Sequence, residues 1–436
     1  MKVATFERGT HPEESKKLTA GKPVLLAKPP QRAIIPLIQH IGAPCKAVVN
    51  VGDEVKKGQV IGEAQGFVST PVHASISGKI IAAGNFPHVS GRDMPALVIE
   101  NDGRDEWVSW LKENNDYLLL TAEEIKNIVK NAGIVGMGGA AFPTHVKLSP
   151  PEEKPINAVI LNGAECEPYL TSDHSLMLQR PEHVVEGLRI IMKAMGVSKG
   201  YIGIEENKPD AIQKISQAVS ETQDIEVFAL EVKYPQGAEK MLIKAILNRE
   251  VPLGGLPMDV GAVVQNVGTA VAIYDAVRYG RPLIERVVTV TGRGIREPKN
   301  LLVRIGTPIL QLIEECGGFS NGIGRVVAGG PMMGIAQTSL DAPVIKGTSG
   351  ILVLREDEVE DVDYGSCIRC GRCVDACPMG LQPSILSILA ERGHYKDMRQ
   401  YNLMDCFECG TCAYLCPARR PILQWIKLAK FILAKK

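Results

Sequence analysis

The sequence predicts a multidomain protein of mixed α/β and α+β architecture. Its 436 residues exceed what one hydrophobic core usually organises, which favours three or four domains of roughly 100–150 residues each. The apolar run AVIL at residues 158–161 is followed by Asn-Gly, as expected for a buried strand of an α/β sheet. Eight of the eleven cysteines lie after residue 366, which indicates a C-terminal domain of different chemistry.

Composition and charge exclude several classes of protein. Hydrophobic residues make up 45% and charged residues 22%, which is ordinary for a globular protein. Lys and Arg (49) balance Asp and Glu (49), so no nucleic-acid partner held by phosphate contacts is expected. The start, MKVATFERGTHPEESKK, lacks the apolar core of a secretory signal, and the apolar stretch 261–277 is interrupted by Gln265, Asn266 and Asp275. Neither export nor a membrane-spanning helix is expected.

Residues 36–118 are expected to form a small β domain behind an N-terminal extension of residues 1–35. APCKAVVNVGDEVKKGQVIGEAQGFVSTPVHASISGKI, from residue 43, has short β runs separated by glycine turns. It resembles the lipoyl and biotinyl carrier domains, which implies a barrel-sandwich hybrid. Carriers present a lysine at a hairpin tip, whereas the corresponding residues 63–67 read EAQGF. We therefore expect an unmodified docking or packing module.

Local signals place a helix ahead of a glycine-rich loop. Thr121 with Glu124 three residues later forms a capping box, and Gly133 ends the helical pattern. The loop GIVGMGGAAFPTHVKL follows at residues 133–148, and its glycines bring bare backbone N–H groups close to an anion. Lys147 would add a positive charge to a phosphate. Glycine-rich turns also occur without a ligand, so a simple turn remains the alternative.

Acidic side chains follow the expected strand at residues 158–161. Asn162 and Gly163 end the strand, and Glu165 and Glu167 stand two apart behind them. Ligands of open α/β sheets usually bind at the carboxyl ends of the strands. These carboxylates are therefore candidates for hydrogen bonds to ribose or amide groups, and a solvated turn is the alternative.

Four motifs in matching order carry a resemblance to a known family. GMGGAAFPTHVKL, NGAECEP, YPQGAEKMLIKAI and VVQNVGTA resemble the FMN and NADH site of the flavoprotein subunit of respiratory complex I and of related diaphorase subunits. The resemblance implies a Rossmann-like FMN/NADH domain over residues 119–282. The implied FMN-binding residues are Gly136, Gly138, Gly139, Lys147, Asn162, Glu165, Tyr234, Gly237, Asn266 and Thr269. The implied nicotinamide-nucleotide residues are Phe142, Glu167 and Glu239, of which Glu167 and Glu239 are the catalytic candidates.

The sequence departs from that family at three positions. Ala164 and Ala238 stand where the family usually has acids, and Met137 stands where it usually has an arginine. The resemblance therefore supports FMN binding more directly than the individual NADH contacts. It also leaves a non-enzymatic electron-relay or scaffold subunit as an alternative.

Two segments connect this domain to the cysteines. RVVTVTGRGIREPKNLLVRIGTPILQLIEECGG, residues 286–318, alternates apolar and polar residues and then turns helical in period. It resembles the β-grasp module that follows the nucleotide domain in the same flavoproteins, so residues 283–355 are expected to form a structural, soluble-ligand-binding β-grasp module. REDEVED at residues 355–361 indicates an acidic linker.

The cysteine-rich segment predicts two iron–sulfur clusters. C-x2-C-x2-C-x3-C-P occurs at residues 367–378 and again at 406–417. In this ferredoxin pattern three closely spaced thiolates bind one [4Fe–4S] cluster and the fourth binds the other cluster. Zinc ribbons and disulfides fit this spacing and this chain less well. A ferredoxin-like helical domain over residues 356–418 is therefore expected. Its ligand sets are Cys367, Cys370, Cys373 and Cys416 for one cluster, and Cys406, Cys409, Cys412 and Cys377 for the other.

The tail ARRPILQWIKLAKFILAKK, residues 418–436, predicts a basic amphipathic helix over residues 419–436. It holds six Lys or Arg and no acid, and its apolar residues recur at helical spacing. One alternative packs this helix on its own protein. The other attaches it to an anionic membrane surface or to a membrane partner, and we expect this second role.

The order of modules resembles the C subunits of Rnf complexes, which are membrane-bound ferredoxin:NAD+ oxidoreductases that translocate Na+ or protons. The resemblance spans nearly the whole chain. It implies a peripheral subunit on the cytoplasmic face of the membrane that carries two [4Fe–4S] clusters, FMN and NAD(H). Its implied partners are the other subunits of the complex and, indirectly, ferredoxin. A cobalamin reductase-type flavin/iron–sulfur protein is an alternative, although that family places the carrier-like domain after the nucleotide motif.

Overall fold

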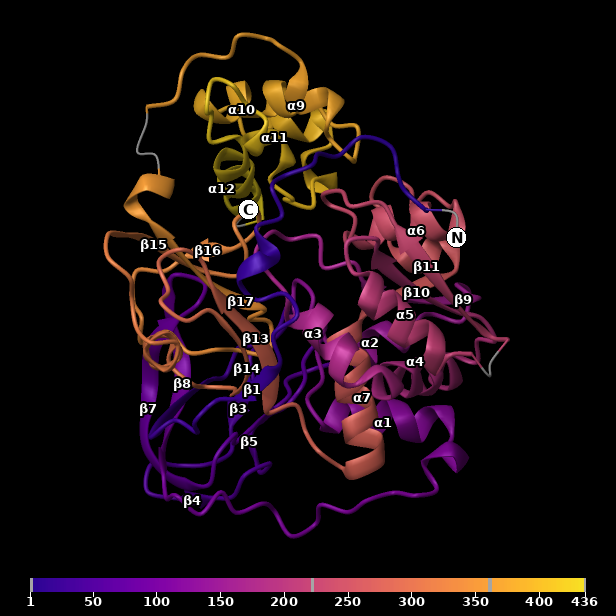
Figure 1. The fold of residues 1–436 in the computed structure, drawn as a ribbon, viewed down its shortest axis with the longest axis vertical. Helices are drawn as coiled ribbons and strands as arrows, with labels where there is room; N and C mark the ends of the chain where they lie inside the picture. The colour runs from indigo at the N-terminus through magenta and orange to yellow at the C-terminus, as the bar shows by residue number, and fades with distance from the viewer. Residues whose placement is uncertain (1–2, 221–222, 360–362, 435–436) are drawn as a thin grey trace.

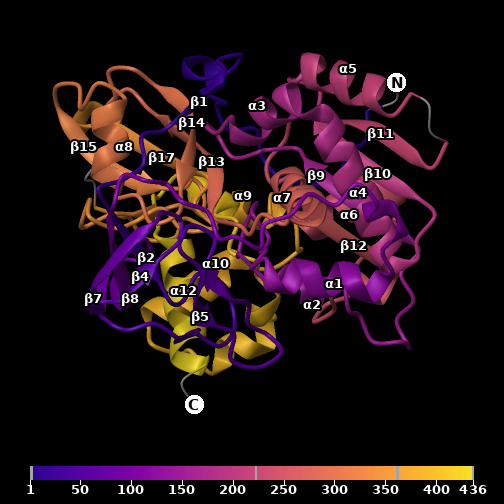
Figure 2. The same cartoon turned by 90° about the horizontal axis from the view of Figure 1, so that it is seen from below.

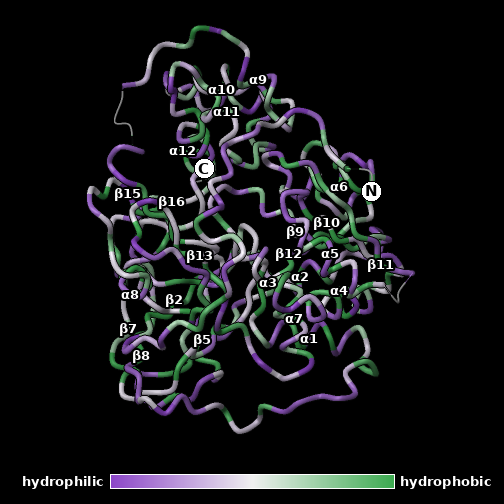
Figure 3. The backbone as a smooth tube through the Cα atoms, in the orientation of Figure 1, coloured by the Kyte–Doolittle hydropathy of each residue, from purple (hydrophilic) through white to green (hydrophobic). Residues whose placement is uncertain are grey.

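The computed structural model describes residues 3–220, 223–359 and 363–434. Figure 1 shows three lobes: a β-rich lobe that contains β7, β8 and β13–β17, an α/β lobe around β9–β12, and a C-terminal lobe of short helices. The β-rich and α/β lobes lie on opposite sides of the molecule in both views (Figures 1 and 2). Apolar residues follow the strands and helices of every lobe (Figure 3). No helix in the described residues is long and apolar enough to cross a bilayer.

Two antiparallel sheets form the first part of the β-rich lobe. Their core contains buried Ile35, Ile61, Ile80 and Leu97. One sheet has the order β2-β8-β7-β4, and the other has the order β3-β5-β6. The strands are β2 (Arg32–Pro36), β3 (Lys46–Ala47), β4 (Glu54–Val55), β5 (Val60–Glu63), β6 (Val72–His73), β7 (Gly78–His88) and β8 (Arg92–Asn101). Because β2 pairs with β8 from Arg32 onward, this unit begins before the expected boundary at residue 36.

A six-stranded mixed sheet forms the other part of the β-rich lobe. Its order is β1-β14-β13-β17-β15-β16, and β1 from the N-terminal extension pairs in parallel with β14. Helix α8 (Ile309–Glu315) buries Ile309, Leu312 and Ile313 in the core of this unit. The strands are β1 (Val24–Leu26), β13 (Glu285–Thr291), β14 (Lys299–Arg304), β15 (Ile323–Ala328), β16 (Ile335–Ala336) and β17 (Gly350–Arg355).

The α/β lobe is built on a parallel sheet of order β11-β10-β9-β12. The expected strand at residues 158–161 is its β9 and is fully buried, with Val159 and Leu161 in one core and Ile160 in the other. The strands are β9 (Ala158–Gly163), β10 (Gly200–Glu205), β11 (Ile225–Leu230) and β12 (Ala262–Asn266). The helices are α1 (Ala122–Asn131), α2 (Thr144–Lys147), α3 (Ser172–Gln179), α4 (Pro181–Met195), α5 (Pro209–Ala218), α6 (Glu239–Leu247) and α7 (Val267–Tyr279).

The C-terminal lobe packs its last helix into its own core. Helix α12 (Ile422–Ala434) lies against α10 (Pro383–Glu391), and Ile422, Ile426 and Ala429 are buried between them and their neighbours. The lobe also contains α9 (Arg372–Asp375) and α11 (Thr411–Tyr414). One face of this helix is therefore covered by the chain itself, while Leu428 is 44% exposed, so the attachment role stays a prediction. Residues 435–436 of the tail and 360–362 of the acidic linker lie outside the described residues.

Short 3-10 helices connect these elements. They are η1 (Lys16–Leu18), η2 (Tyr117–Leu119), η3 (Pro257–Val260), η4 (Glu356–Glu358), η5 (Asp397–Tyr401) and η6 (Leu403–Asp405).

The N-terminal segment crosses all three lobes (Figure 1). Ala4 forms a parallel bridge with Leu230 at the end of β11. Gly9 N then donates to the carbonyl oxygen of Ala376 in the C-terminal lobe at 3.1 Å. Further along, β1 completes the six-stranded sheet. The extension is therefore a structural tie between the lobes.

Candidate functional site

The residues predicted to bind a nucleotide gather at the carboxyl edge of the parallel sheet. Asn162 lies near the end of β9 and Asn266 ends β12, and these two residues face each other in the strand register. Tyr234 and Gly237 follow β11, and Glu239 begins α6. Because parallel strands end at the same edge, the fold brings together segments that are far apart in the sequence.

The glycine-rich loop between α1 and α2 approaches this edge closely. A Cβ atom added at Gly138 would lie 2.7 Å from Asn266 Nδ2, so a larger residue would have to displace that side chain. A Cβ atom at Gly139 would meet no atom within 4 Å, and residues 138–140 are exposed. Gly136 N donates to the carbonyl oxygen of Phe142 at 2.9 Å, which closes the loop on itself. The exposed backbone beside Gly139 provides the cradle that an anionic ligand needs.

The Thr269 side chain is hydrogen-bonded to the backbone of the same loop. Its buried hydroxyl accepts a hydrogen bond from Met137 N at 2.9 Å and donates to the carbonyl oxygen of Val135 at 3.3 Å. Arg286, from β13, donates to the carbonyl oxygen of Met137 at 3.2 Å. The Thr269 hydroxyl thus positions the loop in this structure.

Lys147 and Glu239 form one ion pair. Lys147 Nζ donates to Glu239 Oε2 at 2.7 Å and to the carbonyl oxygen of Val264 at 3.2 Å. Both side chains are partly exposed, at 27% and 39%. The predicted phosphate lysine and the predicted nicotinamide glutamate therefore meet, and a bound phosphate would share the Lys147 ammonium with Glu239.

Asn162 and Gly237 lie side by side. Asn162 Nδ2 donates to the carbonyl oxygen of Gly237 at 2.7 Å, and Gly237 N lies 3.2 Å from Cys166 Sγ. Burial raises the pKa of the Cys166 thiol, and the nearby Glu205 carboxylate adds to that effect. Cys166 is consequently a neutral packing group under Gly237.

The Glu165 carboxylate caps helix α3. Glu165 has a left-handed backbone with φ of 48°, and its oxygens accept from Asp173 N at 2.7 Å and His174 N at 3.2 Å. Asp173 is itself partly buried and accepts from Asn266 Nδ2 at 2.7 Å. Burial raises the pKa of Asp173 to about 7, and the Glu165 charge contributes to this shift. Glu165, Asp173 and Asn266 therefore form one hydrogen-bond network near the glycine-rich loop.

Glu167 and Tyr234 are hydrogen-bonded to two other lobes, Glu167 to the loop between β15 and β16 and Tyr234 to the C-terminal lobe. Glu167 Oε1 accepts from Met332 N at 2.8 Å and Met333 N at 2.9 Å. Burial raises the pKa of Glu167, whereas these amides and the Tyr234 hydroxyl oppose the shift. The Tyr234 side chain is only 1% exposed, and its hydroxyl donates to the carbonyl oxygen of Cys409 at 2.7 Å. This bond joins the nucleotide edge directly to a cysteine loop.

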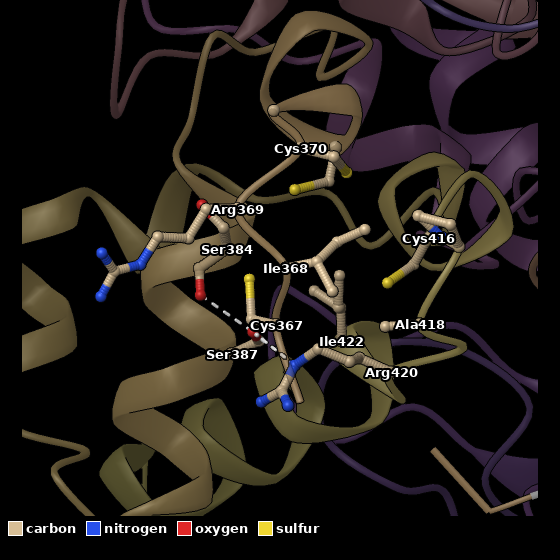
Figure 4. A pocket seen from close by; sticks show the side chains of 13 residues that line it. Cys367, Ile368, Arg369, Cys370, Ser384, Ser387, Cys416, Ala418, Arg420 and Ile422 are labelled. Atoms are coloured by element: carbon tan, nitrogen blue, oxygen red, sulfur yellow. Dashed lines mark hydrogen bonds between the residues drawn. The ribbon is translucent and has the colours of Figure 1, made fainter. Parts of the chain in front are cut away.

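The eight cysteines of the repeated pattern divide into two groups in space. Cys416 lines one pocket with Cys367, Cys370 and Cys373, although it comes from the second repeat (Figure 4). Burial raises the pKa of the Cys412 thiol, and the next contributions come from Cys409, Cys406 and then Cys377. Among the described residues, no three Cys, His, Asp or Glu side chains are arranged to hold a single metal ion. Each group offers four thiols, the donor set that a [4Fe–4S] cluster requires.

Three side chains donate to backbone carbonyls of the second group. Besides Tyr234 at Cys409, Arg8 Nη1 donates to the carbonyl oxygen of Cys377 at 3.4 Å. Lys430 Nζ, from α12, donates to the carbonyl oxygen of Cys406 and pairs with Glu408 at 3.0 Å. The N-terminal segment, the α/β lobe and α12 therefore converge on this group.

Sequence reasoning did not identify the buried charges that shape the site. Lys208, at 1% exposure, donates to the carbonyl oxygen of Ala164 at 2.7 Å and pairs with Glu205 at 3.2 Å. Lys16 and Arg286 are buried in the same region. A buried lysine or arginine looks like a surface one in a sequence, so no local signal reveals it. For Asp173, its place five residues after the NGAECEP motif is the available signal.

Four family models match successive parts of the chain. The RnfC barrel-sandwich hybrid domain matches residues 4–104, the Nuo51 FMN-binding domain residues 129–275, the SLBB domain residues 287–336 and the 4Fe-4S dicluster domain residues 366–419. The expected barrel-sandwich hybrid, FMN domain and two-cluster domain are thereby confirmed at the level of domain family.

Curated relatives are similar over the whole length. The chain is 53% identical over 429 residues to the C subunit of the proton-translocating ferredoxin:NAD(+) oxidoreductase complex of Clostridium ljungdahlii, which covers 98% of this chain and 94% of the relative. It is 49% identical over 430 residues to the Na(+)-translocating counterpart of Acetobacterium woodii, with 99% and 97% covered. The C subunit of the ion-translocating oxidoreductase complex of Rhodobacter capsulatus is 44% identical over 436 residues, with 98% and 83% covered.

Proposed function

The chain belongs to the family of C subunits of ion-translocating ferredoxin:NAD+ oxidoreductase complexes, and we propose that it is the subunit where NAD(H) exchanges electrons with that complex. It is an oxidoreductase subunit with an FMN-binding domain and a two-cluster domain, and it acts with the other subunits of the complex. The proposal includes a peripheral position on the cytoplasmic face of the membrane. The β9–β12 sheet then serves as a Rossmann-like scaffold, and the six-stranded sheet as the β-grasp module.

The residues at the sheet edge fit FMN. The exposed backbone at Gly138 and Gly139 and the partly exposed Lys147 side chain offer donors to a phosphate. When bound, FMN accepts a hydride as two electrons and releases them singly, which suits a site between a nicotinamide and one-electron clusters. The residues proposed to hold it are those named from the sequence: Gly136, Gly138, Gly139, Lys147, Asn162, Glu165, Tyr234, Gly237, Asn266 and Thr269. Phe142, Glu167 and Glu239 are proposed to contact the nicotinamide nucleotide.

The two cysteine groups are proposed to hold crossed clusters with distinct positions. The hydrogen bond from Tyr234, which follows β11, to the Cys409 carbonyl supports the distinct positions most strongly, because Cys409 belongs to the group proposed with Cys406, Cys412 and Cys377. The other group is open to the surface, where Cys370 is exposed and neighbouring Ile368 is 67% exposed. We assign the Cys406 group to the nucleotide side and the Cys367 group to the partner side.

A visible spectrum after anaerobic reconstitution tests this function. NADH should bleach the flavin of the wild-type protein, whereas no response would favour a relay or scaffold subunit. Lys147→Ala should lower FMN occupancy with intact clusters, because the phosphate loses a charge-assisted partner worth about 1.5–3 kcal/mol. Glu239→Gln should retain FMN and slow its reduction by NADH.

Lys154→Ala is the matched control for the lysine variant. Lys154 forms a comparable ion pair with Asp259, at 2.5 Å, away from the sheet edge. Lys154→Ala should have the FMN occupancy and the rate of flavin reduction by NADH of the wild type. Wild-type FMN content and reduction rate in Lys147→Ala and Glu239→Gln would refute the residue assignment while leaving the family intact.

A further inference from the structure

The loop between β9 and α3 has an unusual backbone. Residues 164–170 carry the two acids of the proposed site, Glu165 and Glu167. Glu165 and Tyr169 both have left-handed conformations, with φ of 48° and 68°, although neither is glycine. Such conformations persist only where the surroundings enforce them. The loop therefore needs an external constraint.

Lys16 from the N-terminal segment supplies that constraint. Its Nζ atom donates to the carbonyl oxygens of Glu165 at 2.9 Å, Glu167 at 2.9 Å and Leu170 at 2.6 Å. An ammonium group has three N–H donors, and all three are used here. The residue is 9% exposed, and its pKa is lowered by burial while the Glu165 carboxylate opposes the shift. An adjacent backbone bond, from Tyr169 N to the carbonyl oxygen of Glu14 at 2.8 Å, fixes the same segment to the loop.

The position of this lysine links it to the site rather than to general packing. The three carbonyls belong to the loop that presents Glu165 to helix α3 and Glu167 to Met332, Met333 and Tyr234. Removing the donor would leave three inward carbonyls without a partner, and the loop would relax toward ordinary backbone conformations. Such a change would alter where both carboxylates stand.

We propose that Lys16 is a positioning residue of the nucleotide site, which fixes loop 164–170 so that Glu167 can recognise the nicotinamide nucleotide. The N-terminal segment is thereby part of the NAD(H) site. This inference rests on the proposed function, since it assigns a further residue to the same site. Lys16 acts through the loop backbone and does not touch the nucleotide itself.

The test uses the reconstituted full chain with Lys16→Met and Lys16→Arg, and with Lys17→Met as the control. Lys17 is the exposed neighbour on the same turn. Lys16→Met should raise both KM for NADH in dye reduction and Kd for NAD+ measured by calorimetry about tenfold, the equivalent of one charge-assisted hydrogen bond. The EPR spectra of the clusters should be unchanged, because the cysteine loops are not altered.

Lys16→Arg retains the charge but has a planar group that cannot direct three donors from one atom. It should fold even if Lys16→Met does not, and it should show the same rise in KM and Kd to a smaller extent. Unchanged KM and Kd in a folded Lys16 variant would overturn the inference. So would a parallel loss of FMN, clusters and kcat without a change in KM, since that describes a purely structural role. A wild-type protein that does not respond to NADH would overturn the proposed function and this inference together.

Discussion

At the scale of single residues, Asp173 is an acid whose surroundings disfavour its charge. It is partly buried near the glycine-rich loop, and its pKa is raised to about 7 by desolvation and then by the neighbouring Glu165. The hydrogen bond from Asn266 and the charge of buried Arg286 oppose this shift. A protonated Asp173 would still accept from Asn266, so the network tolerates either state.

This shift predicts a pH dependence of stability. The folded pKa of Asp173 lies above its unfolded value, so the folded state binds more protons between about pH 4 and about pH 7. Its contribution to stability is therefore present at low pH and lost as the pH rises through about 7. Asp173→Asn should flatten the fall in Tm between about pH 5 and about pH 7.5, measured anaerobically by circular dichroism. Asp116→Asn, at an exposed position, should follow the wild type, and parallel curves for Asp173→Asn and wild type would refute the assignment.

The role of a residue could be predicted from the sequence where a motif requires that residue type. It could not be predicted where the role depends on burial in the folded protein. The spacing of the eight cysteines and the glycines at 136, 138 and 139 is visible in the sequence, because backbone approach and thiolate chemistry need those residue types. The roles of Lys16 and Lys208 depend on distant carbonyls that enclose them. Thr269 shows the intermediate case: it was predicted as an FMN-binding residue, and in the structure its hydrogen bonds are with the loop backbone.

At the scale of elements, local patterns predicted which segments fold but not what they contact. The capping box of Thr121 and Glu124 is present at the start of α1, and the apolar run 158–161 lies within β9. Strand β1 pairs with β14, from another part of the chain, and no local pattern indicates that partner. Helix α12 was predicted from its amphipathic spacing. Its contact with α10 was not, because an apolar face does not specify which surface covers it.

The packing of α12 predicts that the C-terminal helix stabilises the cluster domain. Ile426 is 1% exposed in the core of the lobe, whereas Leu428 on the same helix is 44% exposed. Ile426→Asp would bury a carboxylate among apolar side chains, which should cost about 3 kcal/mol or more and reduce the iron and sulfide content. Leu428→Asp is the matched control and should retain both clusters. Full cluster content in Ile426→Asp would show that the helix is dispensable for the lobe.

At the scale of the whole molecule, the cysteine group beside the α/β lobe is where the lobes meet. Arg8 of the N-terminal segment, Tyr234 of the α/β lobe and Lys430 of α12 each donate to a carbonyl of this group. The N-terminal segment thus contacts both regions. Arg8 donates to the Cys377 carbonyl of the proposed cluster group, and Lys16 donates to the Glu165 carbonyl of the proposed nucleotide site. This arrangement depends on the assembly of all lobes, so the sequence of any single domain does not reveal it.

The crossed grouping of the cysteines gives a prediction that depends on this whole arrangement. Cys377 lies with the Cys406 group and Cys416 lies with the Cys367 group, so each belongs to the other repeat's site. Cys377→Ser should therefore damage the cluster beside Tyr234, and Cys416→Ser should damage the outer one. EPR spectra after dithionite would show which cluster remains in each variant. Spectra after NADH would show whether that cluster still receives electrons from the nucleotide site. Cys416→Ser should keep the wild-type response to NADH, whereas Cys377→Ser should lose it while its outer cluster stays reducible by dithionite. Selective loss of the Cys367 cluster in Cys377→Ser would instead mean that each repeat binds its own cluster.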